Sequence, residues 1–320
     1  MNPITRFLST AFFAALLGQA PSALAQDYPS KPIIVLHGLA VGGQTDQSVR
    51  LLSDAVAKVL HTPLVVEARP GAAQTIAATA LANSRPDGYT IGHFYQGVFS
   101  TTPLVQKTVD RRDDLTPIIA WQMSPQLLVV RSDSPYKTLA ELVEAAKSPD
   151  GVYFGHTGKG TVTFLAPTVF AKVAGIHLNE VQYKGDSDLI TAVLGGHLPM
   201  ASVTEVAAAP LIESGKMRAL VTFGQTRSSN FPDVPTFKEQ GYDVPIQVPV
   251  GIIFAPKGTP QAIRQTLHDA IKKALDDPEV KSQFARMKQV LYYMNGDDVD
   301  ALIDKERNVY SPILREVFAD

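Results

Sequence analysis

The sequence predicts an α/β protein built mainly on parallel sheets. Apolar, strand-like runs alternate along the chain with segments in which apolar residues recur every three or four positions, a pattern typical of α/β folds. A chain of 320 residues with 45% hydrophobic content is long enough to bury a substantial core in one or two domains. Its formal net charge of −2 lacks the basic excess of nucleic-acid-binding proteins, so we expect no nucleic-acid partner.

Short runs rich in β-branched and aromatic residues predict the strands. They are Ile33–His37, Leu64–Glu67, Tyr89–Tyr95, Leu127–Arg131, Val152–Gly155, Glu180–Tyr183, Met217–Phe223 and Gly251–Ala255.

The spacing of apolar residues between these runs predicts helices. Val49, Leu52, Val56 and Val59 fall on one face of a helix whose start Thr45 or Asp46 can cap. Further helix signals are the capping box from Thr138 to Glu141, the pair Thr259-Pro260, the segment Asp186 to Leu194 before Gly195-Gly196, and the mostly helical end from Pro260 to Phe318.

The N-terminal segment has the pattern of a secretory signal peptide. Arg6 precedes the apolar run Phe7 to Leu17, and Ala23-Leu24-Ala25 follows as an A-x-A cleavage site. The apolar run is much shorter than the roughly 20 residues of a membrane-spanning helix. We therefore predict that residues 1–25 are a signal peptide cleaved after Ala25, and that the mature protein is periplasmic. The sequence contains no cysteine, which excludes disulfide bonds and thiolate metal ligands.

Two turns of similar composition each follow a predicted strand and precede a predicted helix. They are Val41-Gly42-Gly43-Gln44-Thr45-Asp46 and His156-Thr157-Gly158-Lys159-Gly160-Thr161, and Leu165, Val169 and Val173 mark one face of the second helix. Backbone N–H groups at a helix N-terminus lack internal partners and lie at the positive end of the dipole, so such turns bind carboxylate or phosphate. Facing each other from two lobes, the turns would form a cleft for a small anion. The alternative is that their glycines only shape the turns.

Motifs for other chemistries are absent from the sequence. Lys159-Gly160-Thr161 interrupts the GK[ST] of a phosphate loop, and no GxGxxG, GxSxG or HExxH motif occurs. The histidines are scattered, although His37, His93 and His156 lie near strand ends, where α/β proteins bind ligands. We therefore expect no catalytic residue, no cofactor and no metal site.

A series of motifs in order along the chain resembles the substrate-binding proteins of tripartite tricarboxylate transporters, the TctC-like family or Bug receptors. The motifs are GGxxD at Gly42 to Asp46, VEARPGA at Val66 to Ala72, PDGYT at Pro86 to Thr90, YKG at Tyr183 to Gly185, SGKMRAL at Ser214 to Leu220, FPDVPT at Phe231 to Thr236 with EQGY at Glu239 to Tyr242, and APKGTP at Ala255 to Pro260. The resemblance covers essentially the whole predicted mature chain.

This resemblance implies a type II-like periplasmic binding protein, or Venus flytrap, with two Rossmann-like lobes joined by crossing strands. It places one lobe at residues 27–124 plus 249–320 and the other at residues 125–248, with crossovers near Gln126 to Leu128 and Gln247 to Pro249. It also implies a monomer that captures a small di-, tri- or aromatic carboxylate and passes it to integral membrane transporter subunits.

The site implied by the resemblance holds the carboxylate through backbone amides, hydroxyl groups and ordered water. Asp46 is expected to shape its turn without touching the anion. The candidate ligand-binding residues are Leu39, Val41, Gly42, Gly43, Gln44, Thr45, Asp46, Tyr95, Gln96, Gly97, Val98, His156, Thr157, Gly158, Gly160, Thr161, Tyr183, Lys184 and Gly185.

The chain departs from the family pattern at three places: Leu39-Ala40-Val41 replaces a Phe-Pro-Pro-like approach, Leu198 to Val203 lacks the usual carboxylates at Pro199 and Val203, and Pro249 replaces an aromatic residue. If these positions line the pocket, it is roomier and less polar than usual and favours an aromatic or medium-chain dicarboxylate. Otherwise they only pack the lobes. Two other functions stay open: a secreted hydrolase or isomerase that uses His37 or His156 as a base, and a ligand-binding partner of a sensor kinase.

Overall fold

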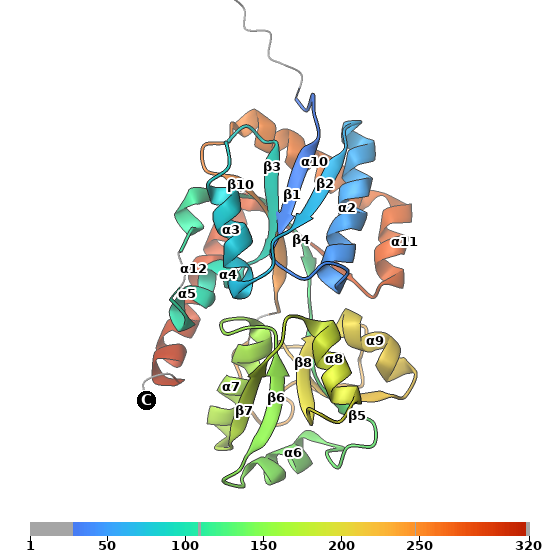
Figure 1. Cartoon of the computed structure of the whole chain (residues 1–320), viewed down its shortest axis with the longest axis vertical. Coiled ribbons are helices and arrows are strands. Elements are labelled where there is room, and N and C mark those ends of the chain that lie inside the picture. Colours follow the sequence, from blue (N-terminus) through green and yellow to red (C-terminus); the bar gives the residue numbers. More distant parts are fainter. Residues whose placement is uncertain (1–27, 108–109, 247, 318–320) are drawn as a thin grey trace, which may run out of the picture. The chain divides into compact units, whose positions relative to one another are not determined.

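Two mixed β-sheets and the helices around them form the unit from Lys31 to Asp320 (Figure 1). The computed structural model describes residues 28–107, 110–246 and 248–317. The predicted signal peptide and its cleavage site lie outside these residues. Among the helices within the described ranges, none has the length and apolar character needed to cross a membrane.

The first sheet has the strand order β11-β4-β10-β3-β1-β2. Its strands are β1 (Ile33–His37), β2 (Leu64–Ala68), β3 (Thr90–Tyr95), β4 (Leu115–Met123), β10 (Val250–Pro256) and β11 (Val290–Asn295). Strand β1 runs parallel to β2 and β3, whereas β10 is antiparallel to both β3 and β4. The accompanying helices are α2 (Gln44–Leu60), η2 (Ala72–Gln74), α3 (Thr75–Ala82), α4 (Gly97–Ser100), α5 (Thr102–Val105), η3 (Arg112–Asp114), α10 (Gln261–Asp276) and α11 (Pro278–Arg286).

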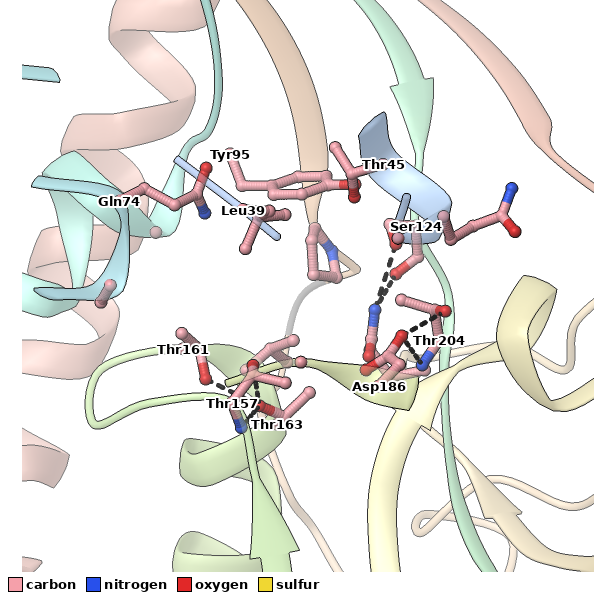
Figure 2. Close-up of a pocket in the computed structure, with 18 of the residues that line it drawn as sticks. Leu39, Thr45, Gln74, Tyr95, Ser124, Thr157, Thr161, Thr163, Asp186 and Thr204 are labelled. Atoms are coloured by element: carbon pink, nitrogen blue, oxygen red, sulfur yellow. Dashed lines mark hydrogen bonds between the residues drawn. The ribbon is translucent and has the colours of Figure 1, made fainter. Parts of the chain in front are cut away.

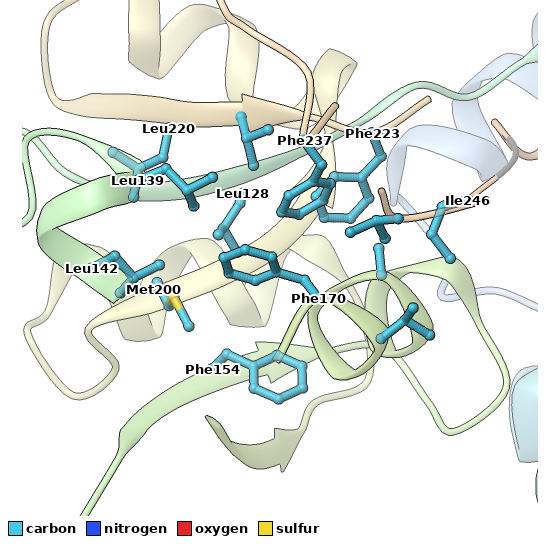
Figure 3. Packing of buried hydrophobic residues seen from close by; sticks show 14 of the residues in the cluster. Leu128, Leu139, Leu142, Phe154, Phe170, Met200, Leu220, Phe223, Phe237 and Ile246 are labelled. Atoms are coloured by element: carbon cyan, nitrogen blue, oxygen red, sulfur yellow. The ribbon is translucent and has the colours of Figure 1, made fainter. Parts of the chain in front are cut away.

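The second sheet has the strand order β7-β6-β8-β5-β9. Its strands are β5 (Gln126–Arg131), β6 (Val152–His156), β7 (Leu178–Gln182), β8 (Met200–Thr204) and β9 (Met217–Thr222), with helices α6 (Leu139–Ala146), α7 (Val162–Ala174), α8 (Asp186–Leu194) and α9 (Glu205–Glu213). Figure 3 shows its aromatic core, in which the ring centroid of Phe237 lies 4.8 Å from that of Phe170 and 5.4 Å from that of Phe223.

The predicted α/β class is confirmed, and each of the eight predicted strands is present with its ends within two residues of the prediction. The prediction of mainly parallel sheets is wrong, because β10 and β5 run antiparallel to both of their neighbours. A strand buried on both faces is a continuous apolar run whether its neighbours are parallel or antiparallel. The composition therefore did not reveal the direction of these strands. Strands β4 and β11 were not predicted; β4 contains Pro117, a residue that argues against a strand.

Helix starts were predicted with mixed success. The capping box of α6 is confirmed: Thr138 Oγ1 accepts from Glu141 N at 3.2 Å, and Glu141 Oε2 accepts from Thr138 N at 3.0 Å. Helix α10 instead begins one residue late, after Pro260, because the Thr259 hydroxyl donates to the Pro256 carbonyl. Val173, predicted on the inner face of α7, is exposed.

Helix α12 (Gly296–Val317) contributes to the cores beside both sheets. Val299 and Ile303 pack with the apolar residues of the first sheet, including Phe94. Two to three turns later, Tyr310 and Leu314 pack with the residues of the second core. The chain also passes between the sheets at Ser124, whose N–H donates to the Pro249 carbonyl at 2.8 Å.

Candidate functional site

A cavity of about 500 Å³ lies where loops from both sheets meet. Its lining includes residues that follow the carboxyl ends of β1, β3, β6, β7 and β8, which is where α/β folds build ligand sites. Figure 2 shows Leu39, Thr45, Gln74 and Tyr95 along one side, with Thr157, Thr161, Asp186 and Thr204 opposite. The residues of the lining therefore come from widely separated parts of the chain.

The N-termini of several helices reach this cavity. Helix α2 brings Gly43 and Gln44, α7 brings Thr161 and Val162, α8 brings Gly185 and Asp186, and α9 brings Thr204 as its N-cap. The first N–H groups of a helix have no partner within the helix, and they carry partial positive charge. The cavity is therefore suited to an anionic group even though no arginine is among its described lining residues.

The carboxylate of Asp46, which lies outside the cavity lining, stabilises the first turn. One carboxylate oxygen accepts from Gly42 N at 3.0 Å and from Arg50 Nε at 2.9 Å, and the other lies 2.9 Å from His37 Nε2. Burial alone raises the pKa of Asp46, but hydrogen bonds from Arg50, Gly42 and His37 outweigh it and lower the pKa. Burial lowers the pKa of His37. Its Nδ1 accepts from Leu39 N at 3.4 Å, so Nε2 is the nitrogen that donates to Asp46.

Asp46 therefore shapes the turn and does not line the cavity. The expected cap is wrong in its position, because Gly43 is the N-cap of α2 and receives no side-chain hydrogen bond. A carboxylate at the third residue of the helix instead bonds backward to Gly42.

The second turn carries a chain of three threonine hydroxyl groups (Figure 2). Thr163 Oγ1 lies 2.9 Å from Thr157 Oγ1 and 2.7 Å from Thr161 Oγ1, and Thr161 Oγ1 also lies 2.7 Å from the Gly158 carbonyl. Each hydroxyl has a single proton. Because the Gly158 carbonyl can only accept, Thr161 donates to it, Thr163 donates to Thr161, and Thr157 donates to Thr163 unless a ligand offers a better acceptor.

Tyr95 and Gln96 both line the cavity, and hydrogen bonds within the protein engage their side chains to different degrees. The hydroxyl of Tyr95 lies 3.2 Å from Thr45 Oγ1 and accepts from Gln122 Nε2 at 3.2 Å. The Gln96 amide is fully used, since Oε1 accepts from Val250 N at 2.6 Å and Nε2 donates to Glu306 at 3.0 Å. Gln96 is thus a structural residue of the wall.

The turn at η2 was not predicted and contributes Ala73 and Gln74 to the lining. Ala72, Ala73 and Gln74 have φ values of 45°, 49° and 74°, a left-handed run that is costly for residues with a Cβ atom. Gly38 permits it, because a Cβ atom there would lie 2.4 Å from the Cβ of Gln74. Such strain beside a cavity is typical of functional sites.

The structure brings most of the predicted site residues together. Those in the lining are Leu39, Val41, Gly42, Gly43, Gln44, Thr45, Tyr95, Gln96, Gly97, Val98, Thr157, Thr161, Lys184 and Gly185. Those outside it are Asp46, His156, Gly158, Gly160 and Tyr183.

The histidines near strand ends are buried supports. His37, His93 and His156 are each fully buried and outside the cavity lining. His93 accepts from Trp121 Nε1 at 3.1 Å, and burial lowers its pKa to about 3. His156 Nε2 lies 2.9 Å from Glu180, and its Nδ1 accepts from Gly158 N. None is placed to act as a base on a molecule in the cavity.

Sequence reasoning missed other lining residues. They are Gln47, Ala73, Gln74, Thr101, Thr102, Ser124, Gln126, Val162, Thr163, Leu165, Asp186, Ser187, Asp188, Ile190, Thr204, Ala207, Ile246, Glu306 and Tyr310. Many adjoin the predicted turns, so extending each turn into its helix would have found them. Gln126, Glu306 and Tyr310 carry no such signal.

The departures from the family pattern divide into two groups. Leu39, Ala40, Val41 and Pro249 line the cavity. The stretch from Leu198 to Val203 does not, and its residues from Met200 to Val203, which belong to β8, are fully buried. Only the first group can therefore make the cavity less polar.

Comparison with known proteins agrees with this architecture. The family model "Tripartite tricarboxylate transporter family receptor" matches residues 48–318. A UPF0065 protein in the gbd 5′ region of Cupriavidus necator is 37% identical over 282 residues, covering 88% of this chain and 86% of that protein.

Solved structures show the same fold. MatC from Rhodopseudomonas palustris with bound malate is 27% identical, with a TM-score of 0.83 over 90% of this chain and 100% of that chain. The periplasmic binding protein BugD is 25% identical, with a TM-score of 0.81 over 91% of this chain and 98% of that chain. These matches support a periplasmic solute-binding role, and the chain belongs to the tripartite tricarboxylate transporter receptor family.

Proposed function

We propose that this chain is a periplasmic receptor that binds a small carboxylate in the cavity, without turnover, and delivers it to a tripartite tricarboxylate-type membrane transporter. The observation that carries the proposal is the convergence of the N-termini of α2, α7, α8 and α9 on one cavity. Malate in the related MatC supports the choice of a carboxylate. Residues 1–25 serve as the signal peptide in this proposal.

The receptor has two lobes in this proposal, residues 27–124 with 249–320 and residues 125–248, which close on the ligand by hinge motion. Support comes from the sheets, since all strands of the first fall in the first set of residues and all strands of the second in the other. The protein acts as a monomer.

A panel of mono-, di- and tricarboxylates should raise the melting temperature of the protein. A ligand at 100 times its dissociation constant adds roughly 2.7 kcal/mol to the free energy of unfolding. Chromatography of the same mixtures should return each acid unchanged. If no acid in a broad panel shifts the melt, the binding proposal fails, and if a product forms, the protein is an enzyme.

Replacing Thr157 by valine should weaken carboxylate binding by about 1 to 3 kcal/mol, because the turn loses the hydroxyl that can turn its proton from Thr163 to the ligand. Titration calorimetry measures the change. Thr266→Val, at a half-buried position of α10 outside the cavity lining, is the matched control and should bind like the wild type. Equal affinity in the Thr157 variant would mean that the hydroxyl chain only supports the turn.

A further inference from the structure

Acidic side chains outnumber basic ones in the cavity lining. Among its described lining residues the acidic ones are Asp186, Asp188 and Glu306, and the basic one is Lys184. Lys184 and Asp188 are exposed, whereas Glu306 is buried between Gln96 and Ser100. Burial raises the pKa of both Asp186 and Glu306, a cost of ionisation that further negative charge in the cavity would increase and a cation would reduce.

The two ends of the cavity differ in polarity. At the threonine turn, backbone N–H groups begin α7. Gln44 Nε2, at the start of α2, is a further buried donor without a partner among the described residues. Figure 2 shows Asp186 and Thr204 set apart from Thr157 and Thr161 along the same side. The threonine end is therefore the place for a ligand carboxylate.

At the other end the protein supplies its own anion. Asp186 is the first residue of α8, and one oxygen of its carboxylate accepts from Thr204 Oγ1 at 2.6 Å and from Thr204 N at 3.2 Å. Thr204 is the N-cap of α9. The protein thus places its own carboxylate beside the start of α9, where a second ligand carboxylate would meet a like charge.

An unpaired acceptor lines the same end. Gln126 is 3% exposed, and its Nε2 donates to the Ser124 carbonyl at 2.8 Å and lies 3.1 Å from Ser124 Oγ. The carbonyl can only accept, so this contact fixes the orientation of the amide. Gln126 Oε1 is then a buried acceptor with no partner among the described residues. A buried acceptor of this kind requires a donor.

The charge of Asp186 reaches the opposite wall. Burial raises the pKa of the Tyr95 hydroxyl, and the negative charge of Asp186 raises it further. Tyr95 lines the cavity from β3, beside Thr45. Asp186 and Tyr95 both line the cavity, from opposite sides, so the Asp186 carboxylate is within reach of a molecule bound there.

We propose, on the basis of the proposed function, that the preferred ligand is an aminocarboxylate, with its carboxylate at the threonine turn and its protonated nitrogen at Asp186 and Gln126 Oε1. An ammonium group supplies several N–H donors and one positive charge. It satisfies the unpaired acceptor and offsets the acidic residues, which a second carboxylate cannot do. The preferred ligand class is then a zwitterion and not a polycarboxylate.

The experiment compares molecules that differ only at one end. Titration calorimetry of the wild-type protein uses 4-aminobutyrate against glutarate and 5-aminovalerate against adipate, each pair having the same carbon spacer with ammonium or carboxylate at its end. We expect each amino acid to bind at least tenfold more tightly than its dicarboxylate partner. Dicarboxylates that bind equally or better overturn this inference and leave the carboxylate receptor standing. If neither series binds, the proposed function itself is in question.

Single-residue variants test whether Asp186 causes the preference for the amino acid over the dicarboxylate. Asp186→Asn should weaken binding of 4-aminobutyrate at least tenfold without weakening that of glutarate, and Asp186→Ser, which keeps an acceptor for Thr204, should do the same. Asp133→Asn removes one exposed charge outside the cavity and should leave both affinities unchanged. Melting curves without ligand verify folding. A preference for the amino acid that survives in both folded Asp186 variants would contradict the role of this carboxylate.

Discussion

Replacing Asp46 by alanine should lower the free energy of unfolding by about 3 to 5 kcal/mol, the range for breaking a buried charged network. Asp46 is 2% exposed and holds His37, Arg50 and the Gly42 N–H. Its removal leaves the buried His37 donor and the turn amide without their acceptor. Denaturant unfolding measures the change, and ligand affinity should fall with it because the loop from Leu39 to Gln44 loses its support.

The stabilisation by Asp46 also has a defined pH dependence. Because its pKa is lowered in the folded protein, the contribution is present above the ordinary pKa of a carboxyl and is lost as pH falls through the lowered value. The variant should lack this acid-sensitive part of the stability. Asp54→Ala, at an exposed position of α2, is the control and should change stability by less than about 0.5 kcal/mol. A similarly small effect at Asp46 would contradict the network.

Replacing Gly160 by valine should reduce ligand affinity by roughly 100-fold. Gly160 lies in the threonine turn at φ +87°, and a Cβ atom there would lie 2.6 Å from Thr102 Cα in α5. Its carbonyl accepts from Thr101 Oγ1 at 2.7 Å, so this glycine is where the loops of the two sheets touch. Left-handed strain costs about 1 to 2 kcal/mol and overpacking about 1 to 3 kcal/mol.

A matched variant at a second glycine separates the cost of backbone strain from the cost of overpacking. Gly241 has φ +88° and no heavy atom within 4 Å of its ideal Cβ position. Gly241→Val therefore carries the same backbone strain without the collision, and it should lower stability while leaving affinity unchanged. Titration calorimetry measures the ligand affinity of both variants, and melting curves measure their stability. If the Gly160 variant binds as well as the Gly241 variant, contact between α5 and the threonine turn is not needed for binding.

Features local in the sequence were predictable. The turns at Val41 to Asp46 and His156 to Thr161 stand between a strand and a helix, and both contribute to the cavity as expected. Their glycines and threonines are enough to indicate accessible backbone N–H groups and hydroxyls at these positions. The direction of strand β10 was not predictable, because its continuous burial hides whether its neighbours run parallel or antiparallel.

Features that depend on distant parts of the chain were not predictable. Asp186 was expected in a helix, but no periodic pattern reveals that its carboxylate bonds to Thr204, 18 residues later. Glu306 meets Gln96 across 210 residues, and Gln126 lies in a strand that reads as simply apolar. The helical and strand periods of the sequence specify which residues share one face of a single element. The cavity depends on which of these faces the topology brings together.

Helix α12 joins the apolar cores beside the two sheets, in addition to the strands that cross between them. Its first half is anchored by Val299 and Ile303 and its second half by Tyr310 and Leu314, in two separate cores. Spreading the sheets must therefore either pull Tyr310 and Leu314 from their apolar surroundings or bend the helix, and Pro312 is the natural position for such a bend. Part of the resistance to opening therefore comes from the apolar contacts of Leu314, which lies outside the cavity lining. A change at Leu314 would alter the separation of the sheets without altering the cavity wall.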